Sequence, residues 1–370
     1  MRISFLKTQS LKIVLPCLLL LFPVFTSASE SAAAVSVSTT VAEINKYGSA
    51  VLEMDSDDFN RAGFALGDIV TVTSGSWSED MPYLNGYYVD RDQYVLVAYP
   101  GEDNITAAIN YGSFSAASGI AAGAPVTVTL KEPAGALELQ EINDLVYSDD
   151  RADSGSDAEF ANFRAVVEGK LYRSASPVDN KRNRAPFADE CIRSANVQTV
   201  MNMSDTAEEI RAFFEDADYS SPYYYDLFED GKVIALGMDI DYTSDEFASN
   251  IVKGFSFLAE QNVPFLIHCL EGKDRTGFAA MLLEALIGWD EEQIVADYML
   301  TYSNYYGIEP GTKKYNMIAE KNVKEMLCFI AGTEIDASLD GFDLQAAAED
   351  YLVSHGMEKE AVKTLREKLF

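Results

Sequence analysis

Residues 268–277 read His-Cys-Leu-Glu-Gly-Lys-Asp-Arg-Thr-Gly, and the predictions for the second half of this 370-residue chain start from this stretch. The apolar run Pro264–Ile267 comes directly before it and is typical of a buried strand. The apolar residues after it recur with the spacing of one helix face: Phe278, Met281, Leu282, Ala285 and Leu286. The pattern therefore predicts a strand, a tight loop, and a helix that begins at the loop.

The loop between Cys269 and Arg275 has the composition of an anion-binding site. Its five intervening residues can curl so that successive backbone N–H groups point at one phosphate-sized anion, and the helix N-terminus adds partial positive charge. The same field stabilises a thiolate, which makes Cys269 a candidate nucleophile. Arg275 offers a planar fork for two phosphate oxygens, Thr276 can donate its hydroxyl to the sulfur, and Gly272 permits the turn.

The pattern His-Cys-x-x-Gly-x-x-Arg-Thr-Gly resembles the phosphate-binding loop of the cysteine-dependent protein-tyrosine and dual-specificity phosphatases. Its inner part, Gly-Lys-Asp-Arg-Thr-Gly, is most similar to a bacterial branch of secreted tyrosine and phosphoinositide phosphatases. Residues 162–164 (Asn-Phe-Arg) and 171–175 (Leu-Tyr-Arg-Ser-Ala) resemble the opening segment of that branch, and residues 348–365 resemble its closing helices. The resemblance implies an α/β phosphatase domain with a central, mainly parallel sheet flanked by helices.

The residue types assign roles within the loop. Cys269 is predicted to attack phosphorus, Arg275 to hold the oxygens, and His268 to orient the loop or the thiolate. The phosphate-binding loop is completed by Leu270, Glu271, Gly272, Lys273 and Gly277. The alternative for Cys269 is a packed core thiol, which is the interpretation that we give to Cys191 and Cys328. The register of the surrounding residues favours the nucleophile.

The general acid has two candidates. The bacterial branch that the chain resembles carries an aspartate inside the loop, at the position of Asp274 here. Many other members of the superfamily carry theirs about 30 residues before the nucleophile, where this chain has Asp239 and Asp241. We favour Asp274 and keep Asp241 as the alternative, although in so acidic a chain either one could be merely solvated.

Several basic residues bear on the substrate. In related enzymes that act on inositol lipids, a lysine inside the loop contacts additional phosphates, and Lys273 occupies such a position; the alternative is an ordinary exposed lysine. The possible substrate rim comprises Arg173, Lys181, Arg182 and Arg184, the last three from the densest basic cluster of the mature chain. A run of this kind is otherwise a solvated loop.

The sequence predicts neither a metal nor a cofactor. The chain has two histidines, and the three mature cysteines are too widely spaced for a ligand cluster. It also lacks the Gly-x-x-x-x-Gly-Lys-[Ser/Thr] motif of nucleotide hydrolases.

The N-terminus predicts export. Residues 1–29 carry Arg2, Lys7 and Lys12, an apolar stretch from Ile13 to Phe25 and then small residues, as a secretory signal peptide does. The alternative is an uncleaved anchor, although the apolar stretch is short for one. Cleavage after Ser29 takes the formal charge from −31 to −34. So acidic a chain does not bind nucleic acid through its bulk field, and the mature protein is predicted to be secreted or periplasmic.

The composition changes along the chain. Residues 36–140 predict a small all-β barrel or sandwich, because alternating runs such as Ile69–Thr73 and Val126–Leu130 are separated by turn residues. This region faintly resembles the C-terminal barrel of S-adenosylmethionine hydroxide adenosyltransferases, without their catalytic domain, so a binding, docking or structural role is expected. Residues 148–158 predict a linker, and residues 159–370 the phosphatase-like domain.

The function predicted from these observations is hydrolysis of phosphomonoesters through a phosphocysteine intermediate. Phosphotyrosine protein is the favoured substrate, and an inositol phosphate or phosphoinositide is the alternative. A prediction of another class is a protein that captures phosphorylated ligands without turnover.

Overall fold

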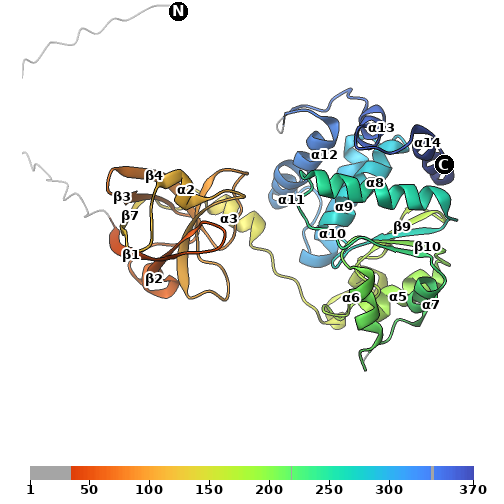
Figure 1. Cartoon of the computed structure of the whole chain (residues 1–370), viewed down its shortest axis with the longest axis horizontal. Helices are drawn as coiled ribbons and strands as arrows, with labels where there is room; N and C mark the ends of the chain where they lie inside the picture. The colour runs from red at the N-terminus through yellow and green to blue at the C-terminus, as the bar shows by residue number, and fades with distance from the viewer. Residues whose placement is uncertain (1–34, 218, 335–336) are drawn as a thin grey trace, which may run out of the picture. The chain divides into compact units, whose positions relative to one another are not determined.

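The computed structural model describes residues 35–217, 219–334 and 337–370, and the chain divides into two units, residues 1–135 and 136–370 (Figure 1). The predicted signal peptide, residues 1–29, lies outside the described residues. Among the described helices, none combines the length and the hydropathy that a membrane span requires. Each unit has a hydrophobic core of its own, so each is considered separately.

The first unit is a closed seven-stranded barrel with the strand order β1-β2-β6-β5-β4-β3-β7. Its strands are β1 (Ser36–Ile44), β2 (Ala50–Asp55), β3 (Ile69–Ser74), β4 (Trp77–Leu84), β5 (Tyr94–Val97), β6 (Asn104–Ile109) and β7 (Pro125–Glu132). Two short helices, α1 (Ser56–Arg61) and α2 (Phe114–Ser118), lie between strands. The strands predicted at residues 69–73 and 126–130 are confirmed as β3 and β7, which pair with each other. Closure removes the free edges that an open sheet would expose.

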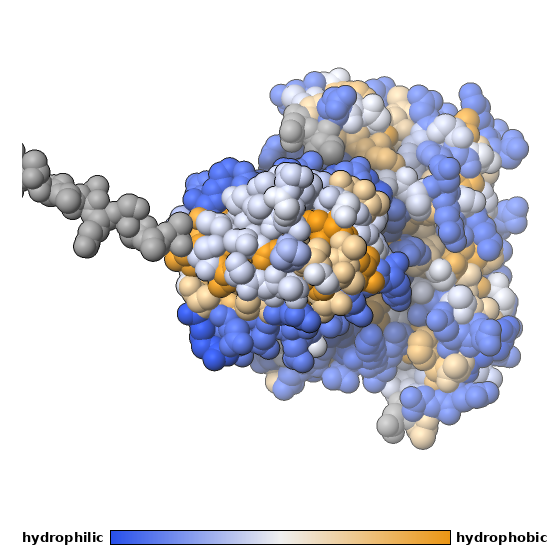
Figure 2. All heavy atoms as spheres, turned by 60° about the vertical axis from the view of Figure 1, so that its left-hand side comes forward, coloured by the Kyte–Doolittle hydropathy of each residue, from blue (hydrophilic) through white to orange (hydrophobic). Residues whose placement is uncertain are grey.

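Alternate residues of the barrel strands point into its core. Val70 and Val72 of β3 are fully buried, as are Val126 and Val128 of β7, whereas the threonines between them are only partly buried. This period of two is the one that predicted strands here. The face of the barrel that is turned forward in Figure 2 carries scattered hydrophobic side chains among hydrophilic ones, as ordinary protein surfaces do.

The second unit contains a five-stranded sheet with the order β11-β10-β12-β9-β8. Its strands are β8 (Arg164–Val167), β9 (Leu171–Ser174), β10 (Thr199–Asn202), β11 (Val233–Ala235) and β12 (Phe265–His268). All neighbours run parallel except β8, which pairs antiparallel with β9. The expected mainly parallel sheet with flanking helices is therefore present, and β12 lies at its centre.

Helices cover both faces of this sheet (Figure 1). The helices of the second unit are α3 (Leu137–Asn143), α4 (Asp157–Phe160), α5 (Ala185–Ser194), α6 (Ala207–Phe214), α7 (Pro222–Glu229), α8 (Asp245–Glu260), α9 (Asp274–Leu286), α10 (Glu291–Tyr306), α11 (Lys313–Ile318), α12 (Lys324–Ala331), α13 (Leu344–Ser354) and α14 (Lys359–Leu369), with a 3₁₀ turn at Arg151–Asp153 and a π-helical turn, η2, at Ala319–Val323. Phe265 and Ile267 of β12 face the larger core, formed with α8 and α9, whereas Leu266 faces the smaller one, formed with α5, α6 and α7.

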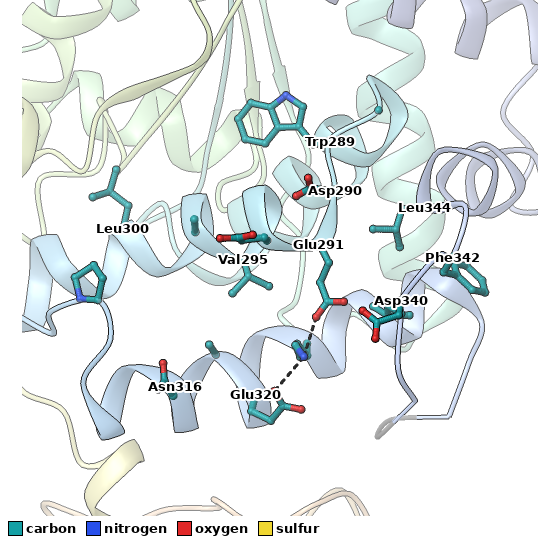
Figure 3. Close-up of a pocket in the computed structure, with 18 of the residues that line it drawn as sticks. Trp289, Asp290, Glu291, Val295, Leu300, Asn316, Glu320, Asp340, Phe342 and Leu344 are labelled. Carbon is teal, nitrogen blue, oxygen red and sulfur yellow. Dashed lines mark ion pairs between the residues drawn. The ribbon is translucent and has the colours of Figure 1, made fainter.

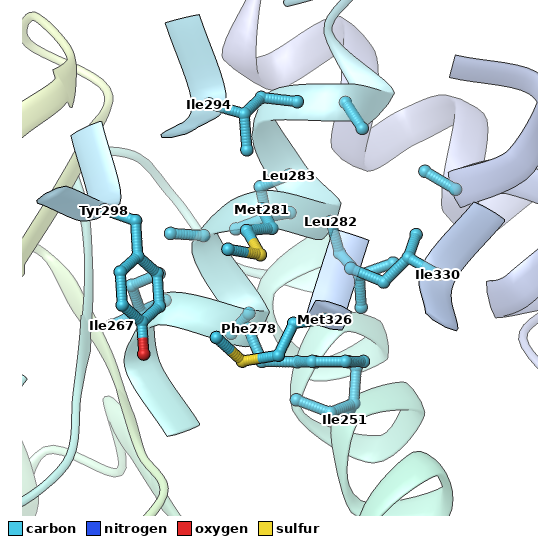
Figure 4. Packing of buried hydrophobic residues seen from close by; sticks show 14 of the residues in the cluster. Ile251, Ile267, Phe278, Met281, Leu282, Leu283, Ile294, Tyr298, Met326 and Ile330 are labelled. Atoms are coloured by element: carbon cyan, nitrogen blue, oxygen red, sulfur yellow. The ribbon is translucent and has the colours of Figure 1, made fainter. Parts of the chain in front are cut away.

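Helix α9 departs from its prediction. The spacing of its apolar residues predicts one buried face, but every residue from Thr276 to Leu286 is buried. Figure 4 shows the reason: Met281, Leu282 and Leu283 of α9 are surrounded by side chains from other helices, among them Ile251, Ile294, Met326 and Ile330. The helix is thus central to the unit, and its N-terminus is anchored where the predicted loop lies.

Candidate active site

The predicted loop connects the end of β12 to the start of α9, so it lies at the carboxyl ends of the parallel strands. Cys269, its first residue, is 2% exposed. Gly272 has a φ of +67°, and a Cβ there would come within 2.3 Å of the carbonyl oxygen of Ser174. Glycine is therefore required at this position both for its backbone conformation and for the close approach of β9.

The backbone of the loop is oriented by hydrogen bonds to its carbonyl groups. The donors are the Ser176 N–H to Leu270 (3.0 Å), the Tyr305 hydroxyl to Glu271 (2.6 Å) and the Arg173 guanidinium to Gly272 (3.0 Å). The backbone N–H groups of residues 270–273 donate to no other described residue. In a planar trans peptide the C=O and N–H point in opposite directions, so the N–H groups of residues 271–273 face the interior of the loop. This is the geometry of an anion cradle.

A largely buried ion pair supports the loop through the backbone carbonyl of Gly272. Asp297 of α10 accepts hydrogen bonds from Arg164 (2.7 Å) and from Arg173 (2.6 Å), and Arg173 also makes the bond to the Gly272 carbonyl. Arg173 is 1% exposed. The structure therefore places Arg173, predicted as a possible rim residue, beneath the loop as a support.

Asn162 connects the same support to the loop. Its side-chain amide donates to the Gly272 carbonyl (3.3 Å) and to the Thr301 hydroxyl (3.2 Å), and its carbonyl accepts from Arg164 (2.8 Å). Its φ of +50° is one that asparagine adopts more readily than most residues. The Asn-Phe-Arg segment that carries part of the family resemblance thus has a structural role in this chain.

A second carboxyl group, Glu284 of α9, is fully buried beside this ion pair. Burial and the charge of Asp297 raise the pKa of Glu284 well above its ordinary value, which favours the neutral form of this carboxyl group. Burial opposes ionisation of Asp297 as well, but Arg173 and Arg164 together lower the pKa of Asp297 below its ordinary value. The two arginines therefore favour the charged form of Asp297, while burial opposes the charge of Glu284.

Three other residues that were predicted for the site, next to Cys269 or at the start of α9, have the following surroundings. Arg275 donates to the carbonyl of Met238 (2.8 Å), which ties α9 to the segment after β11. The Thr276 hydroxyl is buried without a hydrogen-bond partner among the described residues, so the expected bond to the Cys269 sulfur is not formed here. Burial lowers the pKa of His268 to about 3, so its ring is neutral, and Nδ1 lies 3.4 Å from the Cys269 carbonyl oxygen.

The two candidate acids occupy different positions. Asp274 is half-exposed at the first turn of α9 and accepts a hydrogen bond from Lys273 (2.6 Å). Burial opposes the charge of Lys273, but Asp274 raises the pKa of that amine well above its ordinary value. Asp241 accepts from the Thr243 hydroxyl (2.6 Å) and lies three residues after Met238, in the segment that Arg275 contacts. Both acids thus belong to segments that adjoin the loop.

The basic cluster is divided by the fold. Arg184 is buried and forms a hydrogen-bonded ion pair with Asp149 (2.5 Å), and Arg182 contacts Asp149 (3.2 Å) and Glu271 (3.7 Å). Lys181 is exposed. The two arginines are therefore engaged with acids of this chain, in the predicted linker and in the loop, whereas a substrate rim would leave them facing solvent.

A separate groove of about 1190 Å³ lies between α10, the α11–η2 region and residues 339–345 (Figure 3). Its described lining includes Asp290, Glu291, Glu292, Glu320, Asp340 and Asp343. Lys324, the one basic residue among them, is paired with Glu291 (2.8 Å) and Glu320 (3.1 Å). The groove contains no loop residue, and its charge repels a phosphorylated substrate.

The sequence profile of the tyrosine phosphatase family matches residues 154–370, more than half of the chain. The chain belongs to the tyrosine phosphatase family. It is 48% identical over 159 residues to the "Putative tyrosine-protein phosphatase" of Cupriavidus necator, covering 38% of this chain and 55% of that protein. It is 53% identical over 36 residues to the triple specificity protein phosphatase PtpB of Mycobacterium tuberculosis, covering 10% and 13%. The chain thus spans about half or less of these relatives.

Two solved structures match parts of the chain at low similarity. P. aeruginosa TpbA in complex with phosphotyrosine is 19% identical with a TM-score of 0.30, covering 54% of this chain and 98% of that one. The core catalytic domain of the PP-IP phosphatase SIW14 from S. cerevisiae is 19% identical with a TM-score of 0.28, covering 46% and 91%. These scores are too low to transfer a substrate to this chain.

Sequence reasoning missed several residues of the site. Asp297, Thr301 and Tyr305 all lie on α10 at intervals of four, which places them on one helix face, and each contacts the loop or its support. Glu284 lies within an apolar run, where an isolated acid signals a buried partner. These two patterns could have indicated the support from the sequence.

Proposed function

We propose that this protein is a phosphatase that hydrolyses phosphomonoesters through a phosphocysteine intermediate, with phosphotyrosine in proteins as its substrate. The observation that carries the proposal is the loop after Cys269, whose carbonyls are held outward and whose N–H groups face inward. Such a cradle stabilises the equatorial oxygens of a transferring phosphoryl group without a metal ion.

The chemistry proceeds in two displacements. The Cys269 thiolate attacks phosphorus, the P–O ester bond breaks, and the departing oxygen takes a proton from Asp274 or Asp241. Water then attacks the phosphocysteine, the S–P bond breaks, and the same carboxylate takes the proton of the water. Arg275 and the loop N–H groups hold the oxygens in both steps, since a planar guanidinium can donate two parallel hydrogen bonds to a phosphate.

An inositol phosphate or phosphoinositide is the second candidate substrate, because Lys273 places an ammonium inside the loop. Its Nζ lies 2.6 Å from an Asp274 oxygen and its side chain is largely buried, which supports a fixed position for this amine at the loop.

Export and the role of the barrel belong to the proposal as well. Residues 1–29 support export to the periplasm or the medium through a signal peptide. The closed barrel, with its faint likeness to the adenosyltransferase barrel, supports a binding or docking module that carries no part of the loop chemistry.

The experiment measures phosphate release from a phosphotyrosine peptide, a phosphoinositide and inositol hexakisphosphate. Cys269→Ser is expected to abolish turnover. Cys191→Ser is the matched control, because Cys191 is half-buried outside the loop and burial raises its pKa to about 11. Full activity of Cys269→Ser would refute the mechanism. A folded wild-type protein that binds phosphate but releases none from any substrate would instead identify a phosphate-capturing protein.

A second comparison separates the acid candidates. Loss of a general acid slows a substrate with a poor leaving group by about 10²–10⁴-fold. A substrate with a good leaving group is slowed far less, because its leaving oxygen needs no proton. Asp274→Asn is expected to reduce turnover of an alkyl phosphate strongly and of p-nitrophenyl phosphate little, whereas Asp241→Asn affects both equally. The reverse pattern would assign the role to Asp241.

A further inference from the structure

The extended segment of residues 145–150, which we call the strap, is anchored against the phosphate-binding loop. Its residues alternate: Leu145, Tyr147 and Asp149 are partly buried, and the residues between them are exposed. Leu145 packs against the larger core of the second unit. Although the composition of residues 148–158 predicts a linker, the strap thus has one face directed at the phosphatase unit.

The contact with the loop is made by Tyr147. Its hydroxyl donates to the Glu271 carboxylate (2.5 Å), and its ring stacks on Tyr305, with centroids 4.9 Å apart and planes at 21°. The Tyr305 hydroxyl donates to the backbone carbonyl of the same Glu271 (2.6 Å). Two stacked tyrosines therefore hold both the side chain and the backbone of one loop residue, two positions after Cys269.

Arg184 holds the strap in place through contacts with Tyr147, Ser148 and Asp149. The guanidinium carbon of Arg184 lies 5.0 Å from the Tyr147 ring centre, 4.9 Å from that of Tyr305 and 4.5 Å from that of Phe160. Arg184 also donates to the Asp149 carboxylate (2.5 Å) and to the Ser148 carbonyl (2.8 Å). A buried cation that contacts three rings and two strap residues leaves Tyr147 little freedom.

We propose that Tyr147 is a positioning residue for the phosphate-binding loop. Its hydroxyl holds the Glu271 carboxylate on the side of the strap, away from the bound phosphate. A free carboxylate two residues from Cys269 would repel an anionic substrate and the transition state alike. This inference rests on the proposed function and deepens it, since it concerns the same loop. Burial, with the adjacent Glu271 carboxylate, raises the pKa of Tyr147 well above its ordinary value, so its hydroxyl remains a donor at neutral pH.

The test measures anion affinity without turnover. Alkylation of Cys269 by iodoacetamide, a neutral reagent, is followed by mass spectrometry of its peptide at increasing inorganic phosphate, and the protection gives the dissociation constant of phosphate. Tyr147→Phe keeps the ring and its stacking, and is expected to weaken phosphate binding and kcat/KM about tenfold, mainly through KM, as loss of a hydrogen bond to a charged group does.

Two further variants make the result specific. In a Glu271→Gln background the added effect of Tyr147→Phe is expected to fall below about twofold, because no charge remains to be restrained. Tyr172→Phe is the matched control: it removes another tyrosine–glutamate hydrogen bond, to Glu168 at 3.2 Å, at the end of β9 farther from the loop. It is expected to leave phosphate binding unchanged.

Phosphate binding by Tyr147→Phe equal to that of the wild type would overturn the proposal, as would an undiminished effect of Tyr147→Phe in the Glu271→Gln background. Failure of the proposed function has a different signature. In that case the wild-type protein itself shows no protection of Cys269 by phosphate, or binds phosphate without turnover, whatever residue stands at position 147.

Discussion

The barrel and the phosphatase unit differ in where they place polar groups. Among the buried polar residues of the described chain, only Ser49 and Asp68 belong to the barrel, whereas the phosphatase unit buries Arg173, Arg184, Asp189, His268 and Glu284 among others. The barrel core is apolar, and its charges are mostly solvated. Buried charge is costly unless it is paired, so its accumulation in one unit marks the unit that carries the chemistry.

The one buried carboxylate of the barrel illustrates the contrast. Asp68 accepts backbone N–H groups from Ala65 and Ala134, both at 2.8 Å, and so ties two turns together. In the phosphatase unit, Asp297 instead accepts hydrogen bonds from two arginines. One of them, Arg173, also donates to a carbonyl of the loop. A carboxylate thus closes turns in the barrel, and in the phosphatase unit it orients a binding site.

Removal of the Asp297 charge is expected to have the largest effect on this comparison. Asp297→Asn leaves two buried arginines with a neutral partner, and breaking a buried pair costs about 3–5 kcal/mol of unfolding free energy. The matched change in the barrel, Asp80→Asn, removes a partner of Lys131 that is exposed to solvent, and is expected to have little effect.

The two tryptophans allow each unit to be followed separately. Trp77 lies in β4 of the barrel and Trp289 lies beside the core of the phosphatase unit, so Trp77→Phe and Trp289→Phe backgrounds each report one unfolding transition by fluorescence. If Asp297→Asn lowered the unfolding free energy of its unit by no more than Asp80→Asn lowers that of the barrel, the contrast between the units would be contradicted.

The hydrophobic cores should respond alike. Leu282→Ala in α9 and Leu52→Ala in β2 each remove a fully buried side chain, and each is expected to cost about 2–5 kcal/mol. Each loss should appear only in the transition of its own unit, because the two cores are separate. A shift of both transitions by either variant, measured in the single-tryptophan backgrounds, would show that the units unfold as one.

Two glycines with similar backbone conformations are expected to differ in their effect on activity. Gly272→Ala puts a Cβ against the Ser174 carbonyl, so the loop must move, and displacement by about 1 Å costs about 10²-fold in kcat/KM. Gly123 in the barrel has a φ of +80°, and a Cβ added there would meet nothing within 4 Å, so Gly123→Ala strains only its own turn. The measurement is kcat/KM of both variants on a phosphotyrosine peptide, and equal losses would contradict the assignment of the loop.

The local pattern of the sequence was sufficient for the elements and for the loop. The alternating runs of the barrel and the strand–loop–helix around Cys269 are confirmed, because the period of a pattern and the position of a glycine are local properties. The same local logic made α9 amphipathic, which is wrong, since the burial of its second face depends on α10, α12 and α13, far away in sequence.

The partners of the basic residues near the site could not be predicted from local pattern. The sequence predicts a basic rim that includes Arg173, Arg182 and Arg184. Composition alone does not reveal that their guanidinium groups form ion pairs with Asp297 and Asp149. Such pairings join residues between 33 and 124 positions apart. Arg173, for example, comes next to the loop because β9 pairs with β12. The choice between Asp274 and Asp241 as the acid stays a prediction.

The smallest expected effect concerns pH, and here the two units should respond with opposite sign. Burial raises the pKa of Asp189 to about 6, although its carboxylate accepts from the backbone of Tyr224 (2.7 Å) and Tyr223 (3.2 Å) at the start of α7. Its ordinary value is 3.8, so the protonated form stabilises the fold below about pH 4, and this contribution is lost as the pH rises through 6. The loss amounts to about 2–3 kcal/mol in the phosphatase unit.

In the barrel, hydrogen bonds from Lys131 and Thr71 lower the pKa of Asp80, so its contribution is present above about pH 4 and is lost as the pH falls. The unfolding free energy of each unit, measured between pH 4 and 7 in the single-tryptophan backgrounds, should therefore fall with rising pH in the phosphatase unit relative to the barrel. Asp189→Asn keeps one of the two acceptor oxygens for the α7 N–H groups and should reduce that fall by about 2–3 kcal/mol without changing the barrel. A fall of the same size in Asp189→Asn would assign the pH dependence of the phosphatase unit to other buried acids, Glu284 and Asp205, whose pKa values are also raised by burial.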